Sequence, residues 1–90
     1  MKSKKWYMYI VECHDGTLYT GITTDLNRRV NEHNNSTKGA KYTASRRPVR
    51  LVYSKEHPDR SSACIAEAKF KKLRRAQKDV IIELSKNIPK

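Results

Sequence analysis

The chain has 90 residues, of which 20 are Lys or Arg and 9 are Asp or Glu, so its formal net charge is +11. This length predicts a single domain spanning residues 1–90, and no apolar run approaches the ~20 residues that cross a bilayer, which argues against a membrane protein. The excess of positive charge favours a polyanionic partner, with nucleic acid ahead of an anionic membrane surface. The apolar stretch near the N-terminus is too short for a signal peptide, so we expect a cytoplasmic protein.

The first 23 residues predict a β-hairpin that follows a basic tail. Residues 1–5 are rich in lysine, and we expect them to form a flexible tail. Residues 6–13, WYMYIVEC, and residues 17–23, TLYTGIT, are rich in aromatic and β-branched side chains, which is typical of strands. The letters HDG between them are a turn signal, so the two strands are expected to pair.

The length of this turn decides which side chains share a face of the hairpin. A two-residue turn would send Tyr9 and Tyr19 to opposite faces, whereas a three-residue turn with Gly16 in the left-handed conformation pairs Cys13 with Thr17. We prefer the second register because it gathers the apolar side chains. One face then carries Tyr9, Val11, Tyr19 and Gly21. The other, which we expect to be the better core face, carries Trp6, Met8, Ile10, Leu18 and Ile22.

The middle of the chain predicts a helix, a basic loop and a third strand. Residues 25–34, DLNRRVNEHN, have helical spacing, with Thr24 or Asp25 as the N-cap. Residues 35–48 are polar and basic and contain Gly and Pro, which is typical of a loop. Residues 49–55, VRLVYSK, are rich in β-branched and aromatic side chains and predict a strand.

Two helices are expected at the C-terminal end. A cap signal at Asp59 or Ser61 precedes a helical period that continues to residue 75, and residues 76–87 form a last helix. The apolar stripe of this last helix is expected to consist of Val80, Ile81, Leu84 and Ile88. The order β-β-α-β-α-α predicts an α/β protein of the α+β type, with a small three-stranded, largely antiparallel sheet flanked by helices.

Charged residues occur inside two of the apolar helical stripes. The earlier helix has its stripe at i, i+3, i+4 and i+7, made of Leu26, Arg29, Val30 and His33. The later stripe consists of Ala63, Ala66, Glu67, Phe70 and Leu73. A structural interpretation makes Arg29 and Glu67 a half-buried ion pair with His33 packed beside it. A functional interpretation makes them part of a site, because burying a charge costs several kcal/mol and a small chain carries that cost twice here.

Together these residue types suit phosphodiester chemistry. A carboxylate binds a hard divalent cation, and an arginine stabilises the charge that develops on a phosphoryl group. A tyrosine or histidine handles the proton of the attacking water. A glycine such as Gly21 lets a phosphate approach the backbone. The residues themselves therefore indicate metal-dependent phosphoryl chemistry.

Two short motifs add a family resemblance to this chemistry. Tyr7-Met8-Tyr9 stands where the GIY-YIG nuclease superfamily has Gly-Ile-Tyr, and Tyr19-Thr20-Gly21 stands where it has Tyr-Ile-Gly. The following Arg29 and His33 and the later helical Glu67 complete a combination that resembles the small single-domain bacterial branch of this superfamily, over about residues 7–75. The known fold of the family, a short sheet flanked by helices, agrees with the element order predicted above.

The resemblance implies a role for each matching residue. Tyr9 would be the general base or orient the water, and Tyr19 would hydrogen-bond near the phosphate. Arg29 would be the catalytic arginine, His33 would assist proton transfer, and Glu67 would hold a single Mg²⁺ or Mn²⁺ ion. Ile22 stands where some relatives carry a lysine. The chain lacks any help that this lysine gives, so weak activity is an expectation.

A basic segment after the first helix is a candidate contact for nucleic acid, most simply DNA. It contains Lys38, Lys41, Tyr42, Arg46 and Arg47. These side chains either follow a phosphate backbone or form an ordinary solvated loop. Two functions therefore stay open. One is a metal-dependent endonuclease that hydrolyses DNA, selecting structure or relying on a protein partner for specificity. The other is a non-catalytic nucleic-acid-binding module that keeps the nuclease fold.

Overall fold

The computed structural model describes residues 5–35, 38 and 41–86, so most of the tail expected at residues 1–5 lies outside the described residues. The elements follow in the order β1 (Trp6–Glu12), β2 (Leu18–Thr23), α1 (Leu26–Asn35), α2 (Lys41–Ala44), β3 (Arg50–His57), α3 (Arg60–Lys71) and α4 (Arg75–Lys86). This confirms the predicted fold class and adds one short helix, α2, to the predicted order. No helix within the described ranges is long and apolar enough to cross a membrane.

The hairpin has the predicted register. The sheet is antiparallel with the strand order β2-β1-β3, so β1 is central. Tyr9 lies opposite Gly21, and the backbone N–H of Cys13 donates to the carbonyl of Thr17 over 2.8 Å. Gly16 has a φ of +85°, a conformation that L side chains rarely adopt. The three-residue turn is therefore confirmed, and Tyr9 and Tyr19 lie on the same face of the sheet.

The pairing of β1 with β3 contains one irregularity. Ile10 lies opposite Tyr53, but the next residue, Val11, lies opposite Leu51. Val52 is therefore the extra residue of a β-bulge in β3.

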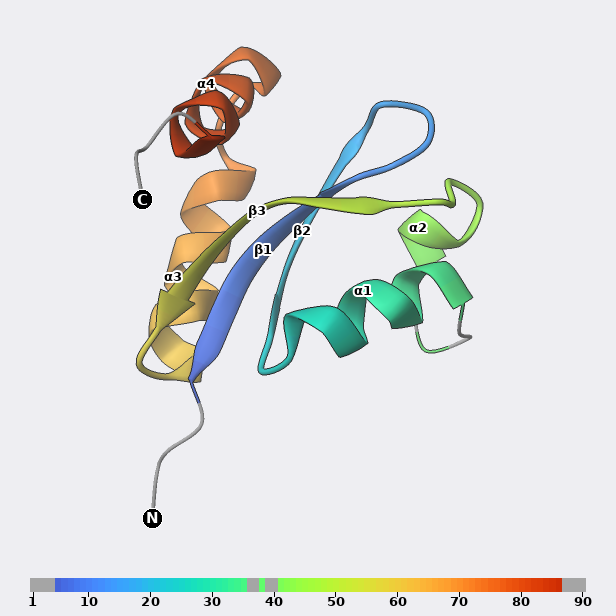
Figure 1. Cartoon of the computed structure of the whole chain (residues 1–90). Coiled ribbons are helices and arrows are strands. Elements are labelled where there is room, and N and C mark those ends of the chain that lie inside the picture. The colour runs from blue at the N-terminus through green and yellow to red at the C-terminus, as the bar shows by residue number, and fades with distance from the viewer. Residues whose placement is uncertain (1–4, 36–37, 39–40, 87–90) are drawn as a thin grey trace.

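Helices cover both faces of the sheet, so β1 is buried between two cores (Figure 1). Helices α3 and α4 cover one face, where the buried cluster is Met8, Ile10, Phe70 and Ile82. Helix α1 covers the other face through Leu26 and Val30, and the buried cluster there is Tyr9, Val11, Cys13 and Val49. The larger cluster lies beneath α3 and α4, on the face expected to be the better core, but the Tyr9 face is also a core face because α1 covers it.

Two aspartates begin the helices that carry the candidate residues. The side chain of Asp25 accepts a hydrogen bond from the backbone N–H of Arg28 over 3.0 Å, at the start of α1. The side chain of Asp59 accepts one from the backbone N–H of Ser62 over 2.8 Å, at the start of α3. Each aspartate was one of two predicted caps, and each satisfies an N–H group that has no partner inside its helix.

The predicted loop at residues 35–48 contains the short helix α2, which is a correction to the sequence analysis. Its four residues are fewer than the two turns that reveal a helical period, and its composition is that of a loop. Thr43 is fully buried in this helix. The segment is therefore anchored to the rest of the molecule by a polar side chain.

The apolar stripe predicted for α4 is also wrong. Val80 and Leu84 are exposed, Ile81 is half-buried, and the fully packed residue is Ile82. Ile88 lies outside the described residues. The run VIIEL offers two overlapping stripes, and contact with the sheet selects the one that contains Ile82.

This correction predicts different effects for two similar truncations in α4. Ile82→Ala should lower the free energy of unfolding by about 2–5 kcal/mol, because Ile82 is only 6% exposed in the core. Leu84→Ala should change it by less than about 0.5 kcal/mol, because Leu84 is 61% exposed. Urea denaturation of both variants measures the difference, and equal losses would contradict the placement of α4.

Candidate functional site

The hydroxyl group of Tyr9 is the centre of the candidate site. Tyr9 projects from the central strand β1 and is only 1% exposed. Its hydroxyl oxygen lies 2.7 Å from Nε2 of His33, and Nε of Arg29 donates to the same oxygen over 3.4 Å. Arg29 and His33 are one helical turn apart on α1, so one face of this helix presents both groups to the strand.

Gly21 makes room for this hydroxyl group. It lies opposite Tyr9 in the hairpin, and a Cβ atom built on Gly21 would be 2.6 Å from the Tyr9 hydroxyl oxygen. The space that an absent side chain was expected to leave for a phosphate is thus occupied by Tyr9. Gly21 positions the Tyr9 ring against β2.

His33 is 0% exposed and is held on both sides of its ring. Nε2 faces Tyr9, and Nδ1 lies 2.9 Å from the hydroxyl oxygen of Thr43. Burial and, to a smaller extent, the positive charges of Arg29 and Arg47 lower the pKa of His33 to about 4, against the opposing effect of Glu32. His33 is therefore neutral at pH 7 and has one free nitrogen lone pair.

Tyr9 is likewise neutral at pH 7. Burial raises the pKa of its phenol, and electrostatic interactions with Tyr19 and Glu67 raise it further. The hydrogen bond and positive charge of Arg29 act in the opposite direction but do not outweigh burial. The site thus contains a neutral phenol and a neutral imidazole in direct hydrogen-bond contact.

Arg29 is held firmly and still has unused donors. Its Nε–H donates to Tyr9, and its Nη1 donates to the Glu32 carboxylate over 3.1 Å and to the Lys38 carbonyl over 2.9 Å. Burial acts to lower the pKa of Arg29, but the bonds to Tyr9 and Glu32 outweigh it and raise the pKa. Within the described ranges nothing accepts from Nη2, so two N–H groups remain available to an anion.

Tyr19 extends the site into a stack of planar groups. Its ring meets the ring of His33 edge-on, with centroids 5.3 Å apart, and stacks on Tyr42 at 5.9 Å. The guanidinium of Arg46 lies 4.1 Å from the centroid of the Tyr42 ring. Two predicted nucleic-acid contacts are therefore continuous with the Tyr9 site.

The basic side chains predicted to contact nucleic acid are of two kinds. The side chains of Lys38 and Lys41 are exposed. Arg46 is tied to the Asp15 carboxylate and the Tyr42 carbonyl, and Arg47 donates to the carbonyl of His33. Both arginines therefore hold the α2 segment in place, whatever else they contact.

Glu67 is a predicted site residue that makes no hydrogen bond to this network within the described ranges. It belongs to α3, the helix that covers the opposite face of the sheet (Figure 1), and its carboxylate pairs with Lys71 at 3.3 Å. Glu67 is close enough for its charge to raise the pKa of Tyr9. The ion pair between Arg29 and Glu67 that the structural interpretation required is not formed, because Arg29 pairs with Glu32 and Glu67 with Lys71.

The residues around Glu67 suit a hard divalent ion that keeps most of its water ligands. Among the residues that the structure describes, no group of three or more His, Cys, Asp or Glu side chains could hold a metal. A single half-buried carboxylate fits Mg²⁺ or Mn²⁺, since Mg²⁺ keeps several water ligands and is often bound by one carboxylate together with substrate phosphates. A site for zinc would need more protein ligands than this.

Two residues of the network were missed by the sequence analysis. Glu32 stands three residues after Arg29, a spacing at which opposite charges pair on a helix, so the sequence contained a signal for it. Thr43 had no such signal, because a single threonine in a polar, basic segment matches no pattern.

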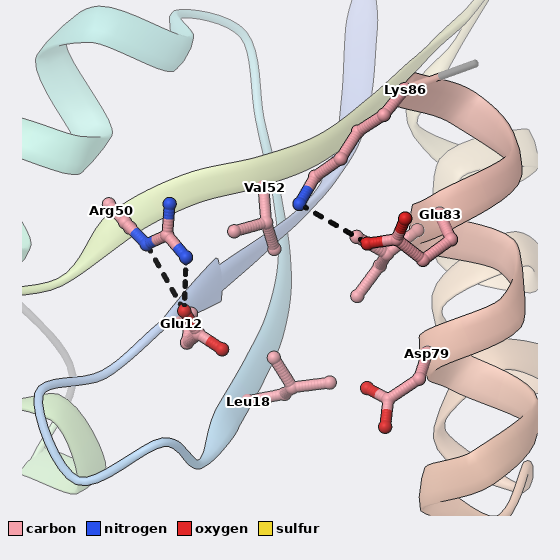
Figure 2. A pocket seen from close by; sticks show the side chains of 8 residues that line it. Glu12, Leu18, Arg50, Val52, Asp79, Glu83 and Lys86 are labelled. Carbon is pink, nitrogen blue, oxygen red and sulfur yellow. Dashed lines mark hydrogen bonds and ion pairs between the residues drawn. The ribbon is translucent and has the colours of Figure 1, made fainter. Parts of the chain in front are cut away.

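A separate hollow lies between the hairpin, β3 and α4 (Figure 2). Its apolar wall, Leu18, Val52 and Ile82, belongs to the core on the face opposite Tyr9. Its carboxylates already have cationic partners: Glu12 with Arg50, Asp79 with Arg75, and Glu83 with Lys86. We therefore assign no chemistry to this hollow.

Comparison with known proteins identifies relatives over most of the chain. A family model described as the GIY-YIG catalytic domain matches residues 5–79. A UPF0213 protein of Desulfotalea psychrophila is 54% identical over 80 residues, which cover 89% of this chain and 73% of that protein. A UPF0213 protein of Streptococcus agalactiae is 53% identical over 81 residues, covering 90% and 91% of the two chains.

Two solution NMR structures have the same fold. The UPF0213 protein from Bacillus halodurans aligns with a TM-score of 0.58 at 45% identity, over 89% of this chain and 84% of that one. A protein from E. faecalis aligns with a TM-score of 0.62 at 39% identity, over 99% and 95% of the two chains.

The contact between Gly21 and Tyr9 predicts that Gly21→Ala breaks the network. The added Cβ would displace the Tyr9 hydroxyl and leave buried polar groups unpaired, which should cost about 1–3 kcal/mol. Gly16→Ala is a matched control, since it should cost about 1–2 kcal/mol through its positive φ without touching the site. NMR signals of the Tyr9 and His33 rings should shift only in Gly21→Ala. Unchanged ring signals in that variant would argue against the observed packing.

The lowered pKa of His33 predicts that stability falls as the pH drops from about 6.5 to about 4. Between these values the unfolded chain binds a proton at His33 that the folded chain does not. The contribution is complete above pH 6.5 and is lost by about pH 4, a total of roughly 3 kcal/mol. Hydrogen bonds from Thr17 and Ser62 lower the pKa values of Asp15 and Asp59, so the stability lost when these two protonate lies below this window.

Urea denaturation at several pH values measures this dependence. His33→Gln should flatten the slope between pH 4 and 6.5, whereas the exposed His14→Gln should keep it. A direct NMR titration of His33 with a midpoint near 6.5 would contradict the prediction.

Proposed function

The chain belongs to the GIY-YIG family, and from this premise we propose that it is a metal-dependent endonuclease that hydrolyses phosphodiester bonds of DNA. The observation that carries the proposal is the pair of hydrogen-bond contacts at one buried hydroxyl, from Tyr9 to His33 and from Arg29 to Tyr9. A purely structural tyrosine needs one such partner, whereas this one is joined to a neutral base and to a cation with unused donors.

Arg29 binds the scissile phosphate in this proposal. Its Nη2 group can donate to a phosphate oxygen, and its other donors hold the guanidinium in place before the substrate arrives. A donor group that is already oriented loses little on binding and stabilises the charge that develops in the transition state. The Tyr19 hydroxyl contacts a second oxygen of the same phosphate.

Tyr9 and His33 move the proton of the attacking water. As the water oxygen bonds to phosphorus and the opposite P–O ester bond breaks, one water proton passes to the Tyr9 oxygen while the Tyr9 proton passes to Nε2 of His33. The leaving oxygen departs with the electron pair of the broken bond and takes a proton from solvent. His33 has an unprotonated nitrogen at pH 7, which makes it able to accept. The charge of Arg29 opposes a proton on His33, and a phosphate bound to Arg29 neutralises this charge and favours the transfer.

Glu67 holds the divalent ion, Mg²⁺ or Mn²⁺. Such an ion, when bound, acts as a Lewis acid that withdraws charge from phosphoryl oxygens. Lys71, which pairs with Glu67, must release the carboxylate for this role. The absence of a lysine at Ile22 fits a modest rate, since the raised pKa of Tyr9 is not countered from that position.

The basic surface holds DNA by its backbone. The formal net charge of +11, the exposed Lys38 and Lys41 and the Tyr19–Tyr42 stack support contacts with phosphates on either side of the cleaved bond. Such contacts carry little sequence information. We therefore expect selection of DNA structure, or a protein partner that supplies specificity.

Removal of the metal ligand or of the arginine is expected to stop cleavage. Glu67→Gln and Arg29→Ala should each slow cleavage of flapped, branched, duplex or single-stranded DNA by at least about 100-fold in Mg²⁺ or Mn²⁺. Glu67→Gln should keep DNA binding, since a negative charge near the phosphate is removed, whereas Arg29→Ala should weaken it. The control is Glu83→Gln, another helical carboxylate with a lysine partner, which should cleave like the wild type.

The alternative, a non-catalytic binding module, has a different signature. Wild-type protein would then cleave none of these substrates, while its DNA affinity would fall with salt at about −0.9 in log–log slope per phosphate contact on duplex DNA. Cleavage by Glu67→Gln at the wild-type rate would likewise contradict the proposed mechanism.

A further inference from the structure

Thr43 contacts His33 but has no role in the reaction proposed above. It is fully buried in α2, and its hydroxyl oxygen lies 2.9 Å from Nδ1 of His33. The opposite nitrogen of the same ring, Nε2, lies 2.7 Å from the Tyr9 hydroxyl oxygen. Three buried side chains from β1, α1 and α2 thus form one continuous hydrogen-bonded chain.

The direction of these bonds follows from the protons available. Neutral Tyr9 has one hydroxyl proton, and Arg29 already donates to its oxygen. Among the described residues the other polar atom in contact with this hydroxyl is Nε2 of His33. A buried proton without an acceptor is costly, so Tyr9 donates and Nε2 accepts. A neutral imidazole that accepts at Nε2 carries its own proton on Nδ1, where it donates to Thr43.

We propose that Thr43 is a positioning residue that keeps His33 in the Nδ1-protonated tautomer, so that Nε2 remains open to the Tyr9 proton. The assignment of a catalytic use to this proton rests on the proposed nuclease function, whereas the tautomer itself does not. In the opposite tautomer both Nε2 and Tyr9 would present protons to one another, and the phenol proton would have no described acceptor.

The choice of a hydroxyl rather than a carboxylate as the partner of Nδ1 suits the surroundings. The charged side chains that influence His33 are Arg29, Glu32 and Arg47, and its titratable neighbours are Tyr9 and Tyr19. A carboxylate at residue 43 would raise the pKa of the ring and favour its cationic form. A threonine hydroxyl orients the ring and leaves it neutral.

The test compares Thr43→Val, which keeps the shape and removes the hydroxyl, with Thr43→Ser, which keeps the hydroxyl. Thr20→Val is the matched control, because Thr20 is also buried but lies outside the network. The readout is the pair of ¹⁵N chemical shifts of the His33 ring in DNA-free and metal-free protein at pH 7, which report the tautomer directly. Thr43→Val should move the tautomer ratio toward the Nε2-protonated form by roughly fivefold, the effect of losing one hydrogen bond. Thr43→Ser and Thr20→Val should retain the wild-type ratio.

Several outcomes decide between this role and a purely structural one. A wild-type ring protonated at Nε2, or an unchanged ratio in Thr43→Val, would overturn the proposal; the wild-type spectrum decides by itself if Thr43→Val does not fold. Cleavage that slows in Thr43→Val, returns in Thr43→Ser and leaves DNA affinity unchanged supports the positioning role. If the ratio shifts as expected but wild-type protein cleaves no DNA, Thr43 still sets the tautomer and the nuclease function fails separately.

Discussion

The packing of the Tyr9 face depends on one constraint: the buried hydroxyl group of Tyr9 needs hydrogen-bond partners. β1 is central and covered on both faces and Tyr9 is only 1% exposed, so in the free protein this hydroxyl group finds its partners inside the protein. His33 and Arg29 supply them from α1, and His33 in turn requires a partner at Nδ1, which α2 supplies through Thr43. The hydroxyl oxygen of Tyr9 thereby helps to determine how α1 and α2 pack against the sheet. Tyr9, to which we give a role in the proposed chemistry, thus also stabilises the fold.

The sequence predicts a feature correctly where its residues allow few other local conformations. The positive φ of Gly16 and the alternation of apolar side chains leave one register for the hairpin, and this register places Tyr9 beside Gly21. The helical spacing of Arg29 and His33 then brings both to the same strand. In each case a local rule and the global fold agree, which is the condition under which sequence patterns are informative.

The features that the sequence leaves open or predicts wrongly are those for which several contacts compete. Arg29 has a carboxylate one turn away, Glu32, and this local pair forms instead of a pair with Glu67 on another helix. The apolar run in α4 is compatible with more than one buried stripe, and only the shape of the sheet beneath it selects Ile82. Thr43 is important because it is the hydrogen-bond partner of Nδ1 of His33, which lies on a different helix, so the sequence around Thr43 does not predict this role. Sequence periodicity can reveal the local pair of Arg29 and Glu32. It does not reveal which stripe of α4 is buried, nor that Thr43 is a partner of His33.

The extra residue in β3 has a consequence for how the strand serves two layers. Side chains alternate between faces along a strand, and one inserted residue reverses that alternation beyond it. Val52 and Tyr53 are neighbours in sequence, yet both pack against the core beneath α3 and α4. Val49, on the far side of the insertion, belongs to the opposite core, where its backbone exchanges two hydrogen bonds with the side chain of Asn34, next to His33. The insertion thus changes the face toward which the residues before it point. Without this residue, Val49 would point toward the core beneath α3 and α4, and its contacts with α1 would be lost.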